Sequence, residues 1–135
     1  MKTIAISGER VSPKRTTITT DDGEFEIGRQ GSPLEYLLGS LAGCINVIGT
    51  LVADDMGIDI SALEIDIAGD IDERRYAGES EDPRAGFQEI RLFIAVESGA
   101  DPETLETWID RVQKRCPVAE NLRNETGLTV DLETA

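Results

Sequence analysis

Histidine is absent from this sequence of 135 residues. Ser-His-Asp and Cys-His catalysis, histidine proton shuttles and the usual catalytic zinc sites all need an imidazole. The chain therefore cannot use any of these. A reactive thiol in it must rely on Arg, Lys or the N-terminus of a helix instead.

Lysine is scarce as well, with three Lys beside ten Arg, and the net charge is -14. A field of this sign repels phosphate backbones and anionic membrane surfaces, so we expect no nucleic-acid partner and no binding to membranes. Acidity with few lysines also predicts a halophilic, salt-rich cytoplasm. There a Debye length of about 3 Å at 1 M salt would screen the self-repulsion of an acidic protein.

Long apolar runs are rare. The N-terminus has no run of signal-peptide length, because Thr3, Ser7 and Glu9 interrupt it, and this predicts a cytoplasmic protein. The uncharged stretch 36–53 approaches the lower limit of a membrane span. Asn46 and several glycines lower its hydropathy, so we predict a buried helix there instead.

Only two cysteines are present, Cys44 and Cys116. In a reducing cytosol such a pair is expected either to take part in reversible chemistry or to be buried and unreactive. A structural disulfide that stabilises the fold is less expected there. The length suits one domain, and we expect residues 1–135 to form a single one.

Hydrophobic periodicity and turn residues predict an α+β fold. We expect strands at 2–7, 14–20, 24–27, 63–67, 87–96 and 128–132, and helices over 32–55, from 101 to 115 and from 116 to 127.

The helix over 32–55 has the clearest local signals. Ser32 as N-cap, Pro33 at the first helical position and Glu35 three residues after the cap make a capping box. Bulky apolar residues repeat on one face of this helix. Small residues, Gly49 among them, gather on another face, where a second element could approach closely.

The two thiols lie at recognisable helix positions. On a helical wheel Cys44 lies about 80° from the centre of the bulky face, at the border of the core. Pro117 disfavours helical geometry at Cys116, which makes Cys116 the cap of a new helix, where the positive helix end favours a thiolate. Taken alone, each thiol could also be a packing residue.

The segment Pro33–Cys44, PLEYLLGSLAGC, followed much later by Cys-Pro-Val from Cys116, resembles the OsmC/Ohr family of osmotically inducible and organic hydroperoxide resistance proteins. The resemblance implies an intertwined homodimer of the OsmC-like fold, with antiparallel sheets around a long central helix. It also implies that Cys44 attacks a small organic hydroperoxide, becomes a sulfenic acid and forms a disulfide with Cys116. A dithiol or lipoyl-type reductant would restore the thiols, with no metal or organic prosthetic group.

The sequence departs from the family's peroxidases at the start of the long helix. Those enzymes have a glutamate that helps to hold an activating arginine, and the corresponding position here is Leu34. Glu35 lies on the opposite side of the helix from Cys44, and a capping role explains it more simply. The activating arginine is therefore open, and our candidates are Arg15 and Arg29.

Three hypotheses follow. The first is a thiol-dependent peroxidase that reduces organic hydroperoxides, with Cys44 as nucleophile and Cys116 as resolving thiol. The second is a small-molecule binding or interaction protein that keeps the fold but lacks peroxidase activity. The third is a protein whose two thiols are purely structural, which requires them to lie far apart or to be sealed from solvent.

Overall fold

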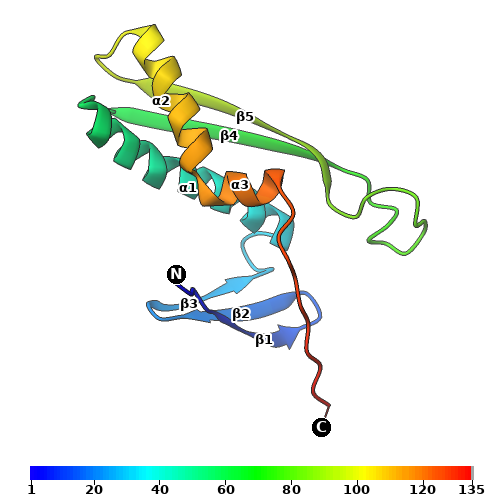
Figure 1. Cartoon of the computed structure of the whole chain (residues 1–135). Helices are drawn as coiled ribbons and strands as arrows, with labels where there is room; N and C mark the ends of the chain where they lie inside the picture. Colours follow the sequence, from blue (N-terminus) through cyan, green and yellow to red (C-terminus); the bar gives the residue numbers. More distant parts are fainter. Residues whose placement is uncertain (135) are drawn as a thin grey trace. The chain divides into compact units, whose positions relative to one another are not determined.

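The computed structural model describes residues 1–134, and its contacts divide the chain into two compact units, Met1–Ser40 and Leu41 onward. The elements in chain order are β1 (Ser7–Ser12), β2 (Arg15–Thr20), β3 (Gly23–Ile27), α1 (Pro33–Met56), β4 (Ala62–Ile71), β5 (Phe87–Glu97), α2 (Pro102–Arg115) and α3 (Pro117–Arg123). This order confirms the predicted α+β class (Figure 1). Helix α1 begins in the first unit and continues into the second.

The first unit is built on a three-stranded antiparallel sheet in the order β1-β2-β3. The hairpin predicted at Asp22-Gly23 joins β2 to β3, with Thr20 opposite Gly23. The strand predicted at 2–7 is wrong, because β1 is Ser7–Ser12. Ser12 pairs with Arg15 across the turn, and an irregularity between Arg10 and Ser12 shifts the register of the rest of β1. The apolar alternation upstream of Ser7 forms no strand.

The capping box at the start of α1 is confirmed. The backbone N–H of Glu35 donates to Oγ of Ser32 at 3.2 Å, and the N–H of Ser32 donates to Oε1 of Glu35 at 3.0 Å. At the other end, Gly57 follows Met56 with φ +68°, a left-handed conformation that glycine adopts without strain. Helix α1 therefore begins and ends close to the boundaries predicted from these two signals.

The second unit contains the antiparallel hairpin β4–β5, in which Ile65 pairs with Ile94 and Leu63 with Val96. These apolar residues share one face of the hairpin and pack against the core. Acidic residues alternate with them along β4 and are exposed. The two runs are thus antiparallel neighbours, as their patterns predicted.

Helix α2 lies across α1 (Figure 1). Trp108 of α2 contacts α1 at Gly49. The indole Nε1 of Trp108 donates to the carbonyl oxygen of Gly49 at 2.8 Å, and a Cβ on Gly49 would lie 3.0 Å from Cζ2 of the ring. A small residue on this face of α1 therefore permits the predicted close approach. The buried cluster around this crossing consists of Leu41, Ile45, Val52, Ala53, Trp108, Val112, Cys116 and Ala119.

The C-terminal part of the chain differs from expectation. Helix α3 ends at Arg123, with Asn124 as its cap, rather than near 127. Residues 128–132 form no strand, and Leu128, Val130 and Leu132 are 83% to 89% exposed. The alternation of apolar and polar residues shows only that a segment could form a strand. The strand itself forms when a neighbouring backbone satisfies its hydrogen bonds, and no described residue does so for 128–132.

By length and composition alone, α1 could cross a membrane; no other described helix could. In this fold, however, its residues Leu41, Ile45 and Val52 belong to the buried cluster with α2.

Candidate functional site

The site is built around the break between α2 and α3. Cys116 is extended, with φ -75° and ψ 112°, because Pro117 follows it. Its N–H donates to the carbonyl oxygen of Val112 and so closes α2, and its Sγ accepts from the N–H of Ala119 at 3.5 Å. Cys116 thus caps both helices, as the sequence predicted, and its side chain is completely buried.

Cys44 lies on α1, next to the buried cluster and only partly buried. Its Sγ is 2.8 Å from Sγ of Cys116, and both thiols are free. A disulfide bond is about 2.05 Å long, so only a small movement of one side chain is needed for the pair to form one when an oxidant removes two electrons. The structure therefore brings together two thiols that lie far apart in the sequence, as the peroxidase hypothesis requires.

The surroundings of Cys44 raise the pKa of its thiol. Burial is the largest cause, and the adjacent Cys116 thiol adds to it through a hydrogen bond. A hydrogen bond from the backbone N–H of Val118 acts in the opposite direction. Within residues 41–134, no Arg or Lys donates a hydrogen bond to either sulfur. This part of the chain alone does not favour a thiolate at Cys44.

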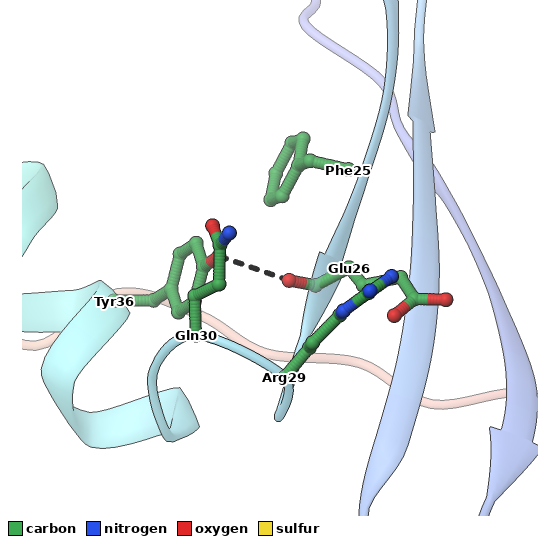
Figure 2. A pocket seen from close by; sticks show the side chains of 5 residues that line it. All are labelled: Phe25, Glu26, Arg29, Gln30 and Tyr36. Carbon is green, nitrogen blue, oxygen red and sulfur yellow. Dashed lines mark hydrogen bonds between the residues drawn. The ribbon is translucent and has the colours of Figure 1, made fainter.

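The two candidate arginines lie in the first unit, where both act on Glu26 of β3. Nη2 of Arg15 lies 2.7 Å from Oε2 of Glu26. This ion pair, with a smaller contribution from Arg29, lowers the pKa of the Glu26 carboxyl. Arg29 itself makes no ion pair within residues 1–134. Figure 2 shows its side chain running from the loop after β3 toward Glu26.

Arg15 has a further free donor. Its Nε is buried and has no hydrogen-bond partner among the described residues. An unpaired buried donor costs free energy unless an acceptor reaches it. The guanidinium is thus fixed by Glu26 at one nitrogen and open at another.

Glu26 was not among our candidates, although the sequence contained a signal for it. The Asp22-Gly23 hairpin places Thr17 opposite Glu26, and Arg15 shares a strand face with Thr17. A diagonal cross-strand pair between Arg15 and Glu26 follows from that register. Glu35, by contrast, is held by Ser32 as its capping role predicted.

A small pocket lies beside Glu26 in the same unit, lined by Phe25, Glu26, Arg29, Gln30 and Tyr36, with a volume of about 220 Å³ (Figure 2). The Tyr36 hydroxyl donates to the carbonyl oxygen of Glu26 at 2.9 Å, which ties the start of α1 to β3. Among the described residues, no group of three or more Cys, Asp or Glu side chains could hold a metal ion.

Comparison with known proteins identifies the family. The model of the OsmC-like protein family matches residues 27–131. The chain belongs to this family. A hydroperoxide reductase of Mycoplasma pneumoniae is 27% identical over 115 residues, which cover 85% of this chain and 78% of that protein.

Solved structures of the family share the fold. The OsmC-like protein from Mycoplasma pneumoniae superposes with a TM-score of 0.80 at 24% identity, covering 92% of this chain and 89% of that one. The organic hydroperoxide resistance protein OhrB of Bacillus subtilis has a TM-score of 0.59 at 21% identity, covering 92% and 93%. The OsmC-like fold predicted from the sequence is thereby confirmed.

Proposed function

We propose that the protein is a thiol-dependent peroxidase that reduces organic hydroperoxides. The observation that carries this proposal is the 2.8 Å distance between the sulfurs of Cys44 and Cys116. The names of its relatives, a hydroperoxide reductase and an organic hydroperoxide resistance protein, support the same class of substrate.

In the proposed reaction the Cys44 thiolate attacks one oxygen of the hydroperoxide. The O–O bond breaks, the alkoxide leaves and takes up a proton to become an alcohol, and Cys44 becomes a sulfenic acid. The Cys116 thiolate then attacks the Cys44 sulfur, a disulfide forms and the hydroxyl leaves as water. A dithiol of the lipoyl type reduces the disulfide by two exchange steps and is itself oxidised.

Cys44 needs a cation to ionise near neutral pH, because burial raises its pKa. We assign this role to Arg15 in preference to Arg29. Glu26 holds Arg15 in place, and the buried Nε of Arg15 is open to a further acceptor such as a thiolate or a peroxide oxygen. In this proposal Glu26 holds the activating arginine. In the family's peroxidases a glutamate at the position of Leu34 has this role.

We further propose a cytoplasmic homodimer. Residues 2–6 and 128–132, which have strand-like alternation, have no described strand partner, and their apolar side chains are largely exposed. A second copy of the chain would supply the missing backbone partners and cover these side chains. A reducing cytoplasm would keep both thiols available for turnover.

One experiment tests the reaction directly. Reduced protein is treated with one equivalent of cumene hydroperoxide, and the mass of the intact protein is measured by mass spectrometry. Wild type should lose two hydrogens as the disulfide forms. Cys116→Ser should gain one oxygen at Cys44, and Cys44→Ser should abolish dithiol-dependent consumption of the hydroperoxide. If reduced wild type consumes none of it, the peroxidase proposal is wrong.

The raised pKa of Cys44 also favours a second candidate function, a small-molecule binding or interaction protein without peroxidase activity. In that case both thiols would alkylate slowly at pH 7. The hydroperoxide would produce no bridge between them. Rapid bridging in the experiment above excludes this second function.

A further inference from the structure

The pocket beside Glu26 has features that the thiol chemistry does not use. We propose that it binds a small aromatic carboxylate, with Arg29 holding the carboxylate and Phe25 and Tyr36 contacting the ring. The proposal does not require the peroxidase reaction, because neither cysteine lines the pocket and all five lining residues belong to Met1–Ser40. One of them, Glu26, also holds Arg15 in the proposed reaction.

The charge of the pocket favours an anion. Two guanidinium groups lie near the single carboxylate of Glu26: Arg15 pairs with it at 2.7 Å, and Arg29 lowers its pKa further. Together these three side chains carry a net positive charge beside the pocket. The chain as a whole is strongly acidic, with a net charge of -14. At physiological salt the Debye length is about 8 Å, so a bound ion responds mainly to the charges next to it.

The polar groups of the pocket are available. Within residues 1–134, the side chains of Arg29 and Gln30 make no hydrogen bond or ion pair to protein. Figure 2 shows both leaving one loop, Gln30 beside the ring of Tyr36 and Arg29 toward Glu26. A guanidinium can grip a carboxylate with two parallel hydrogen bonds, and the amide of Gln30 offers a further donor.

The loop that carries these two residues is fixed in shape. The N–H of Gly28 donates to the carbonyl oxygen of Gly31 at 2.8 Å. Gly28 has φ +101°, and a Cβ there would come within 1.8 Å of the carbonyl oxygen of Lys14. Only glycine fits that position. The donors of Arg29 and Gln30 therefore start from a preorganised backbone, which reduces the entropy lost when a ligand binds.

The apolar wall suits a flat ring. Phe25 and Tyr36 lie nearly parallel, with centroids 5.9 Å apart and an interplanar angle of 15°, and Phe25 is 44% exposed. The hydroxyl of Tyr36 is engaged with Glu26, which holds the ring in place. The volume of about 220 Å³ admits a single substituted ring. Aromatic rings with centroids about 4.5–7 Å apart form a favourable pair, and a ligand ring that contacts the exposed side of Phe25 or Tyr36 would add a contact of the same kind.

The test is a titration of the full-length protein with benzoate, followed by calorimetry and by amide NMR shifts. We expect saturable binding, with the largest shifts at residues 28–31 and at Tyr36. Benzyl alcohol, which has the ring without the charge, should bind at least about tenfold more weakly. Raising NaCl to 1 M should weaken benzoate binding because it screens Arg29.

Variants separate the pocket from general effects of charge. Arg29→Gln should weaken benzoate binding at least about tenfold, and Arg29→Lys should fall between it and wild type because lysine cannot form the paired bonds. Arg10→Gln, which removes the same charge from β1, should bind like wild type. The proposal is overturned if wild type shows no saturable binding of benzoate, if benzyl alcohol binds equally well, or if Arg29→Gln binds as wild type does.

Discussion

Glu26 is the residue on which the proposed activation of Cys44 depends. Its carboxylate holds Nη2 of Arg15 at 2.7 Å. We expect Glu26→Gln to loosen the guanidinium and to slow alkylation of Cys44 at pH 7 severalfold, because a mobile cation stabilises a thiolate less well. The rate is measured with a fluorescent alkylating reagent in a Cys116→Ser background. Glu24→Gln removes the same charge from the same strand and should have little effect; equal rates in all three proteins would contradict the role of Glu26.

The pH dependence of this pair has a definite sign. The Arg15 guanidinium lowers the pKa of the Glu26 carboxyl from its usual value of about 4.3. A carboxyl whose pKa falls on folding stabilises the folded state above its unfolded pKa. That stabilisation is lost as the pH drops through the folded pKa. In the wild-type protein the Glu26 carboxylate should therefore stay ionised and paired with Arg15 down to pH 5. Loss of the Arg15–Glu26 ion pair between pH 7 and pH 5 would contradict this expectation.

At the scale of single elements, the crossing of α1 and α2 depends on Gly49. A Cβ there would lie 3.0 Å from Cζ2 of the buried Trp108. We expect Gly49→Ala to destabilise the fold by about 1–3 kcal/mol through overpacking, measured by urea denaturation. Gly43 lies on the same helix, and a Cβ added to it would meet no atom within 4 Å. Gly43→Ala should be neutral or stabilising by up to about 1 kcal/mol, and equal losses in both variants would contradict the crossing.

Most elements could be predicted because their signals are local. The capping box at Ser32, the glycine at 57 and the proline after Cys116 act within a few residues of the boundaries they set. The failures at 2–7 and 128–132 have a different cause. Those segments have the alternation of a strand, but a strand also needs a second backbone, and sequence alternation does not say where that backbone lies.

The site was partly predictable for the same reason. Each thiol was identified from its own helix, and the family resemblance paired them; their 2.8 Å distance depends on how α1 packs against the break between α2 and α3. The Arg15–Glu26 pair was missed, although the hairpin register implied it. Local sequence patterns do not predict which distant residues pack against each other.

At the scale of the whole molecule, the segment 128–132 tests the proposed dimer. We expect wild type to have about twice the 14.7 kDa mass of one chain by light scattering after gel filtration. Val130→Asp places a charge among the exposed apolar side chains and should shift the protein toward monomer. Thr129→Asp adds the same charge to the alternate face and should remain dimeric. A monomeric wild type would contradict the dimer.

The acidic surface predicts how the whole molecule responds to salt. The net charge is -14, and the ion pairs of Arg74, Arg91 and Arg115 are exposed, so each contributes only about 0–1 kcal/mol. Salt weakens these few attractions, but it also screens repulsion among a larger number of carboxylates, and the second effect should dominate. The midpoint of thermal unfolding at pH 7 should therefore rise from low to molar KCl. A neutral osmolyte at equal osmolality separates screening from exclusion of the solute from the surface. A midpoint that stays flat in KCl would exclude both the repulsion argument and the predicted adaptation to a salt-rich cytoplasm.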